Sequence, residues 1–240
     1  MMGMQSVLRA IYPPACMGCG DMTEADHALC GACWRETPFL GGALCDLCAR
    51  PLPGEAEPDL RCDACLAAPP PWGRARAVLH YRDGARRLVL GLKHSDRTDL
   101  ARPMGLWMAR AAADLAEPDT LVVPVPLHRG RLWRRRYNQS ALLAARIARA
   151  LGREVCADAL WRHRATATLA GQDAEARRAT LDGAIRPHPR RGARMGGRMV
   201  LLVDDVLTSG ATLGACARAA RAAGARAICV VALARAAPDP

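Results

Sequence analysis

The sequence predicts an α/β protein in which a doubly wound parallel sheet follows a small cysteine-rich domain. Short, continuously apolar segments are typical of strands that are buried on both faces of a parallel sheet. After residue 74 such segments alternate with amphipathic helical patterns, which favours helices on both faces of the sheet. Eight of the eleven cysteines lie before residue 66. Hydrophobic residues make up 51% of the 240 residues and aromatic residues only 4%, so we expect a largely aliphatic core.

The chain divides into a head, residues 1–68, and a larger domain, residues 74–240. The segment Ala67–Pro71 between them ends in three prolines and is typical of a stiff linker. Residues 1–70 carry four arginines and nine acidic residues, a formal charge of −5, whereas residues 71–240 carry 30 basic and 14 acidic residues, a charge of +16. A basic surface attracts phosphates, nucleic acid or acidic proteins, so we expect an anionic partner on the larger domain.

The larger domain contains five predicted strands and four predicted helices. The strands are expected over Ala75–Tyr81, Leu121–Val125, Glu154–Ala157, Met199–Val203 and Ala227–Leu233, and the helices over Ala85–Lys93, Ala101–Ala116, Ser140–Leu151 and Ala211–Ala223. Ligands of such folds bind beyond the C-terminal ends of the strands, which is where we expect the functional residues.

The eight cysteines of the head form four Cys-x-x-Cys pairs. One pair supplies two thiolates to a zinc ion, and two pairs complete a tetrahedral site. A disulfide framework is the alternative, but it needs an oxidising compartment. We predict a double zinc ribbon with two structural Zn²⁺ ions, each bound by four cysteines adjacent in sequence, and an interleaved pairing is the alternative. The predicted ligands are Cys16, Cys19, Cys30 and Cys33 for one ion and Cys45, Cys48, Cys62 and Cys65 for the other.

The charge of the head argues against contact with nucleic acid. Two zinc tetrathiolate sites would change its formal charge from −5 to about −9, so a structural or protein-contact role is expected. No uncharged apolar segment reaches 18 residues, and we therefore expect no membrane span. The segment before Cys16 lacks a long apolar stretch and a small-residue cleavage site, so the protein is expected to be cytoplasmic.

The most specific motif is Val200–Thr212, which reads Val-Leu-Leu-Val-Asp-Asp-Val-Leu-Thr-Ser-Gly-Ala-Thr. An apolar strand leads to two carboxylates, a short Thr/Ser/Gly loop and a helix. The N–H groups of such a loop and of the helix N-terminus favour a phosphate. The two carboxylates before it suit neighbouring ribose hydroxyls or a metal-bound sugar. An ordinary helix cap by Asp204 or Thr208 is the alternative, but it explains only one of these residues.

This motif resembles the phosphoribosyl-pyrophosphate (PRPP) motif of type I phosphoribosyltransferases. Three further segments, Leu92–His94, Val123–Arg129 and Arg135–Gln139, resemble the ComF family, as does the multi-cysteine head before a transferase-like domain. The resemblance runs from about Ile11 to Arg235. It implies a sheet of the type I phosphoribosyltransferase kind, Mg²⁺ bound together with PRPP, and a role in DNA uptake during natural transformation.

The resemblance also implies roles for particular residues. Asp204 and Asp205 would contact the ribose hydroxyls and act as the catalytic pair. The 5′-phosphate and the rest of PRPP would lie on Val206, Leu207, Thr208, Ser209, Gly210, Ala211 and Thr212. The pyrophosphate loop would consist of Val125, Pro126, Leu127, His128 and Arg129. Further candidates for the cleft are Lys93, Arg135, Tyr137, Asn138 and Gln139, and Lys93 is the only lysine and Asn138 the only asparagine in the sequence.

Five arginines lie within the eight residues Arg129–Arg136, with Trp133 among them and Tyr137 next to them. Interleaved cations and aromatic rings suit the phosphates and stacked bases of single-stranded DNA. One alternative is an amphipathic segment with a solvated arginine face and Trp133 in the core. The other is that some of these arginines bind pyrophosphate.

Two functions therefore remain open from the sequence. The first is a DNA-uptake protein that binds PRPP or a related nucleotide-like ligand and contacts single-stranded DNA or a DNA-translocating, helicase-type partner. The second is a true phosphoribosyltransferase of nucleotide salvage or synthesis that transfers phosphoribosyl to an acceptor. The zinc ribbons stand where salvage enzymes carry a base-recognising hood, which favours the first function.

Overall fold

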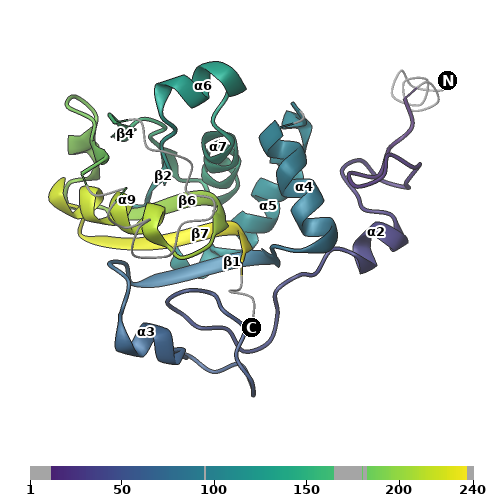
Figure 1. Ribbon diagram of the computed structural model, residues 1–240, viewed down its shortest axis with the longest axis horizontal. Helices are drawn as coiled ribbons and strands as arrows, with labels where there is room; N and C mark the ends of the chain where they lie inside the picture. Colours follow the sequence, from purple (N-terminus) through teal and green to yellow (C-terminus); the bar gives the residue numbers. More distant parts are fainter. Residues whose placement is uncertain (1–11, 95, 165–179, 181–182, 237–240) are drawn as a thin grey trace.

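The computed structural model describes residues 12–94, 96–164, 180 and 183–236, and a parallel sheet forms its centre (Figure 1). Within these residues the sheet has five strands in the order β1-β7-β6-β2-β3, and every neighbouring pair is parallel. The strands are β1 (Arg74–His80), β2 (Leu121–Pro124), β3 (Glu154–Val155), β6 (Met199–Leu207) and β7 (Ala227–Arg235). The predicted doubly wound parallel sheet is confirmed.

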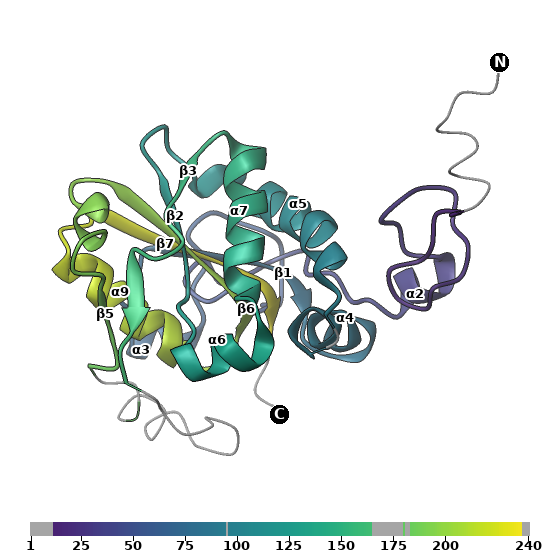
Figure 2. The same ribbon diagram turned by 90° about the horizontal axis from the view of Figure 1, so that it is seen from above.

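Helices cover both faces of this sheet, which explains why its central strands are apolar throughout. One face packs against α4 (Asp83–His94), α5 (Ala101–Ala111) and α7 (Gln139–Leu151), which lie side by side in Figure 2. The other face packs against α9 (Ala211–Ala222), whose Leu213 lies in one cluster with Leu202 and Val230. None of the helices in the described part of the chain is long and apolar enough to cross a membrane.

Some elements differ from their predicted extent. β6 continues beyond Val203 because it stays paired with β7 as far as Leu207. α5 ends at Ala111 because a 3₁₀ turn follows over Ala113–Leu115, and β3 has only two residues. The helix α6 (Arg129–Arg135) and an antiparallel pair, β4 (Leu160–Arg162) with β5 (Ile185–Pro187), were not predicted as elements.

The strand order places a topological switch point between β2 and β6. These two strands are neighbours at the middle of the sheet. After β2 the chain continues to β3 at one side, whereas after β6 it continues to β7 at the other side. A ligand site in an open α/β sheet lies outside the C-terminal ends of the strands at such a switch point. The segments after β2 and after β6 flank this position.

The cysteine-rich head, with the short helices α2 (Gly31–Arg35) and α3 (Asp63–Ala67), runs along the free edge of β1. The backbone N–H of Leu40 donates to the Val78 carbonyl at 2.8 Å, and the N–H of His80 donates to the Pro38 carbonyl at 2.9 Å. Further along β1, the N–H of Ala75 donates to the Asp46 carbonyl at 2.7 Å. The head therefore covers backbone groups that an exposed edge strand would leave unpaired.

Candidate functional site

Asp204 and Asp205 lie in the last part of β6, and neighbouring groups hold both carboxylates in place. Ser140 Oγ donates to Asp204 Oδ1 at 3.1 Å, and the backbone N–H of Asp205 donates to the same oxygen at 2.9 Å. Gln139 Nε2 donates to Asp205 Oδ2 at 2.8 Å. The start of α7 therefore positions both members of the predicted acidic pair.

Lys93 reaches the same pair from the end of α4. Its Nζ lies 3.1 Å from Asp205 Oδ1, and both side chains are largely buried. Because burial weakens solvent screening, this ion pair holds its partners more firmly than a surface pair would. Of the five further cleft candidates, Lys93 and Gln139 thus make direct contact with Asp205.

The other three candidates support this arrangement. Asn138 Oδ1 accepts from the N–H of Ser140 at 3.1 Å and caps α7, while its Nδ2 donates to the carbonyl of Val125 at 3.0 Å. Tyr137 Oη donates to the carbonyl of Leu92 at 2.7 Å, next to Lys93. Arg135 Nη1 donates to Gln139 Oε1 at 3.4 Å. The hydrogen bonds of Asn138 and Tyr137 tie the start of α7 to the end of β2 and to α4.

Burial changes the acidity of Asp204. Removal from water raises its pKa to about 7, and the charge of Asp205 acts in the same direction. The Lys93 cation, the Asp205 N–H and the Ser140 hydroxyl oppose this rise. Ser140, which is 1% exposed, was not among the predicted site residues. A serine near a helix start is common as a cap, so the sequence carried no distinct signal for its contact with Asp204.

The segment after β6 forms a loop that leads into α9. Gly210 precedes the helix with φ 78°, a left-handed conformation that glycine adopts without steric cost. The first N–H groups of the helix have no intrahelical partner, so they are available to an anion. A cleft of about 320 Å³ opens here, and Lys93, Asp204 and Leu213 line it together with all seven residues of Val206–Thr212. Asp205 lies behind this cleft, 5% exposed.

The predicted pyrophosphate loop, Val125–Arg129, lies beside β6 at the switch point of the sheet. The N–H of Val125 donates to the Val203 carbonyl at 2.9 Å. His128 Nδ1 accepts from the N–H of Gly130 at 3.2 Å and caps α6. The residues Val125–Arg129 are not part of the lining of the 320 Å³ cleft, so their role with pyrophosphate stays a prediction.

The helix α6 presents its arginines and Trp133 to solvent. None of its residues is buried, and Trp133 is 85% exposed. The interpretation that places Trp133 in the core is therefore wrong. Arg131 is half-buried, and this partial removal from water lowers its pKa, as do the nearby charges of Arg135 and Arg134. The C-cap Arg136 has φ 65°, a left-handed conformation that is unusual for a residue other than glycine.

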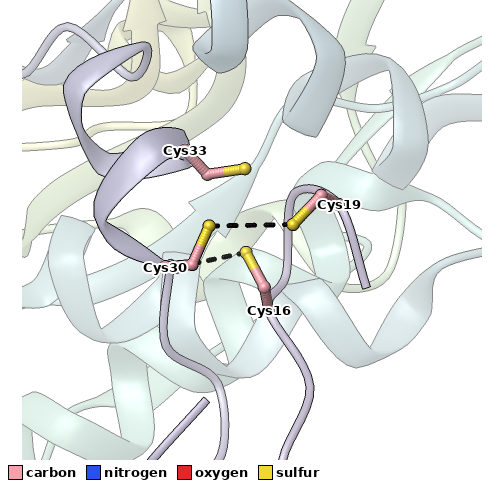
Figure 3. A group of neighbouring side chains, drawn as sticks. All are labelled: Cys16, Cys19, Cys30 and Cys33. Carbon is pink, nitrogen blue, oxygen red and sulfur yellow. Dashed lines mark hydrogen bonds between the residues drawn. The ribbon is translucent and has the colours of Figure 1, made fainter. Parts of the chain in front are cut away.

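The cysteines of the head form two separate groups of four. In the first group, Cys16, Cys19, Cys30 and Cys33, one sulfur atom from each residue lies within 4.8 Å of the others (Figure 3). The second group, Cys45, Cys48, Cys62 and Cys65, meets the same distance. Four clustered thiolates are the donor set of a structural zinc site. The two sites fit zinc with the predicted local pairing, and the interleaved alternative is wrong.

Backbone N–H groups prepare particular thiols for a metal. The N–H groups of Cys30 and Gly18 donate to Cys16 Sγ at 3.2 and 3.4 Å. Burial opposes ionisation of Cys16, but these and related hydrogen bonds outweigh it and lower its pKa to about 6. In the second group the N–H of Cys62 donates to Cys45 Sγ at 3.4 Å, and the pKa of Cys45 falls to about 7 despite its burial. Because zinc binds the thiolate form, a lowered thiol pKa favours metal binding at neutral pH.

Arg235 connects the second zinc site to the loop after β6. Its Nε donates to the Cys48 carbonyl at 2.8 Å, and its Nη1 donates to the carbonyls of Leu207 and Thr208 at 2.9 and 2.8 Å. The side chain is 6% exposed. Sequence reasoning missed this residue because Cys48 lies 187 positions away and no motif links them.

The head and most of the chain are similar to known proteins. The double zinc ribbon domain family matches residues 7–66. DNA utilization protein YhgH of Salmonella typhimurium is 35% identical over 209 residues, which cover 84% of this chain and 88% of that protein. Competence protein F of Haemophilus influenzae is 30% identical over 227 residues, 92% of this chain and 96% of that protein. The structure of a hypoxanthine phosphoribosyltransferase from Staphylococcus aureus aligns with 60% of this chain and 70% of its own, with a TM-score of 0.36 and 13% identity.

Proposed function

Because this chain belongs to the ComF family, which includes DNA utilization protein YhgH and competence protein F, we propose that it binds PRPP with Mg²⁺ and takes part in DNA uptake. One observation carries the ligand assignment. A carboxylate, Asp204, and a loop at the N-terminus of a twelve-residue helix line the same cleft at the switch point of the sheet. This combination suits a sugar phosphate, because hydroxyls and phosphate need acceptors and donors respectively.

The residues of the cleft would divide the ligand between them. The N–H groups of the loop and of α9, with the hydroxyls of Thr208, Ser209 and Thr212, would bind the 5′-phosphate. The ribose hydroxyls would donate to Asp204, with Asp205 as the second acceptor if ligand binding draws it away from Lys93. Bound Mg²⁺ would neutralise pyrophosphate charge while keeping part of its water shell.

Calorimetry with PRPP and Mg²⁺ tests this assignment. The unmodified protein should bind PRPP, and the double variant Asp204→Ala/Asp205→Ala should lose most of that affinity. A matched control is Glu55→Ala/Glu57→Ala, which removes two exposed carboxylates from the head and should bind as the unmodified protein does. Equal affinity in the two double variants would show that the ligand does not use the acidic pair.

Phosphoribosyl transfer is the second candidate function. It is favoured by the raised pKa of Asp204 inside the cleft, because perturbed carboxyl groups gather at sites of chemistry. In that reaction the bond from C1′ to pyrophosphate breaks as a nitrogen nucleophile forms a new bond to C1′. The protein would contribute positioning and charge stabilisation. Pyrophosphate release from PRPP in the presence of a panel of nitrogen acceptors tests this function.

The exposed surface of α6 is the proposed contact for single-stranded DNA. The crowded arginines of Arg129–Arg135 supply positive charge, and Trp133 presents a free ring on which a base can stack. Trp133→Ala should weaken binding of a fluorescent single strand by roughly tenfold, since a stacked base contributes about 1–3 kcal/mol. Leu106→Ala, an exposed apolar change on α5, is the control and should have no effect.

Salt dependence separates this contact from nonspecific attraction. Each arginine that contacts a phosphate and is then removed should reduce the salt slope by about 0.7 for a single strand. A full-length chain that binds no single strand would place its role in contact with a DNA-translocating, helicase-type partner instead. A reducing compartment such as the cytoplasm suits this protein, because it keeps the eight thiols of the head available to zinc.

A further inference from the structure

A second and larger cavity lies between the second zinc ribbon and the loop after β6. It measures about 1050 Å³ and is formed by the ribbon around Cys48 and Cys65, the proline segment Pro69–Pro71, Trp72, the loop Leu207–Ala211 and part of α9. Small-molecule sites are often found where two domains meet, and they have volumes of about 300–1,000 Å³. Lys93 and Asp204 line only the PRPP cleft, so this cavity is a separate space that shares the loop with it.

The wall of this cavity is positively charged. Arg50, Arg218 and Arg235 line it, and no acidic residue belongs to the lining. Even with a net charge of −2 on a zinc tetrathiolate nearby, three guanidinium groups leave the wall positive. Arg235 is already engaged with backbone carbonyls. By contrast, Arg50 Nε has no hydrogen-bond partner in the described part of the chain, so the protein itself does not fully satisfy this guanidinium.

An apolar surface stands beside these cations. The Trp72 indole is held in place, because its Nε1 donates to the Leu47 carbonyl at 2.7 Å. Three consecutive prolines continue this surface. A side-chain carbon added at Gly214 would lie 3.5 Å from Arg218 Nη1 and 3.7 Å from Pro71 Cγ, so the Arg218 guanidinium folds back over α9 towards the proline wall. The cavity therefore offers a rigid apolar surface with a cation at its border.

We propose that this cavity binds a nucleotide at a site separate from the PRPP cleft. Its base would lie against the prolines, beside the part of Trp72 that stays exposed (7%), and its phosphate would accept hydrogen bonds from Arg50 and Arg218. A nucleotide combines a flat ring and a phosphate, which matches the two surfaces of the cavity. The same chemistry is present in a free mononucleotide and in the 5′-phosphorylated end of a single strand.

Calorimetry on the zinc-loaded, full-length protein with dAMP as the probe tests the proposal. Arg218→Ala should weaken dAMP binding by roughly tenfold, the effect of losing a hydrogen bond to a charged group. Arg221→Ala is the matched control, because it removes the same charge from an exposed position on the same helix outside the cavity. It should change the affinity by less than about twofold. Deoxyadenosine, which lacks the phosphate, should bind the unmodified protein more weakly than dAMP binds Arg218→Ala, because it loses the contacts of both Arg50 and Arg218.

Competition identifies the site without depending on the proposed PRPP function. Saturation with PRPP and Mg²⁺ should leave the affinity for dAMP unchanged. If PRPP does not bind the protein, the variant Asp204→Asn replaces this competition, and it should bind dAMP as the unmodified protein does. Displacement of dAMP by PRPP, equal losses in the two arginine variants, or no binding of dAMP would each overturn the proposal. Tighter binding of a 5′-phosphorylated oligonucleotide than of dAMP, with the same loss in Arg218→Ala, would identify the strand end as the source. Tighter binding of dAMP would identify the free mononucleotide.

Discussion

Replacement of Arg235 by alanine should destabilise the protein at the junction between the second zinc ribbon and the loop after β6. The buried guanidinium donates to the carbonyl of the neighbouring Ala236 and to three carbonyls of other segments, those of Cys48, Leu207 and Thr208. Cys48 belongs to the second cysteine group, and Leu207 and Thr208 begin the loop after β6. The substitution therefore leaves the carbonyl in the second ribbon and the two carbonyls in the loop after β6 without their common donor.

The size of the effect follows from these contacts. An acceptor that loses its partner inside a protein costs about 1–3 kcal/mol. All three carbonyl-bearing residues line a cavity that water can enter, so the low end of this range applies. The expected loss of unfolding free energy is therefore about 3 kcal/mol for the three bonds together. Arg235→Lys should recover only part of it, because one ammonium group cannot reproduce the fork of a guanidinium.

Urea unfolding of the zinc-loaded protein measures this loss. The midpoint should fall while the slope stays constant, because the surface exposed on unfolding is unchanged. A chelator should also remove zinc faster from the second site of Arg235→Ala than from its first site. Arg221→Ala, an exposed change on α9, is the control. If the unfolding free energy of Arg235→Ala lies within about 0.5 kcal/mol of that of the unmodified protein, these hydrogen bonds do not stabilise the junction.

Three further predictions concern zinc, Asp204 and Lys93. Metal analysis of protein purified without chelator should find two Zn²⁺ per chain, and a protein with disulfides and no zinc would contradict this. Cys62→Ser should unfold the second ribbon, because metal binding and folding are coupled there. Because Asp204 keeps its proton below about pH 7, PRPP should bind roughly tenfold more weakly at about pH 6 than at about pH 8. The same raised pKa makes folding less favourable as pH rises from about 4 to 7. Asp204→Asn should therefore flatten the pH dependence of PRPP binding and that of the unfolding free energy. If both curves of the variant coincide with those of the unmodified protein, Asp204 is not the group that titrates. Lys93→Met should lower the unfolding free energy by about 3 kcal/mol, because it leaves the buried Asp205 charge without its cation. A loss below about 1 kcal/mol would mean that water already screens the ion pair between Lys93 and Asp205.

Features that depend on neighbouring residues could be predicted from the sequence. The Cys-x-x-Cys pairs bring their thiols together through a local turn, so two zinc sites with local pairing were predicted from the spacing, and the structure decided against the interleaved pairing. The segment Val200–Thr212 contains its own strand, loop and helix start, and the structure places its loop around one cleft. The sheet also followed from local patterns, because buried parallel strands are continuously apolar.

Features that depend on distant contacts could not be predicted. Ser140 contacts Asp204 across 64 positions, and nothing about a serine near a helix start distinguishes this role from capping. Leu132 and Trp133 are adjacent in the sequence, and adjacent residues do not share one face of a helix. The sequence therefore did not indicate which of these side chains faces the core, and the structure shows that both are exposed. The large cavity depends on how the second ribbon packs against the loop, which no segment encodes alone.

The most direct test of the proposed function is a crystal structure of the full chain with PRPP and Mg²⁺. We expect the 5′-phosphate to lie on the N–H groups of the loop Thr208–Thr212, with the ribose hydroxyls facing Asp204 in the last part of β6. Density for PRPP elsewhere on the molecule, or a cleft that stays empty at a PRPP concentration well above the calorimetric Kd, would contradict the proposed binding of PRPP in this cleft.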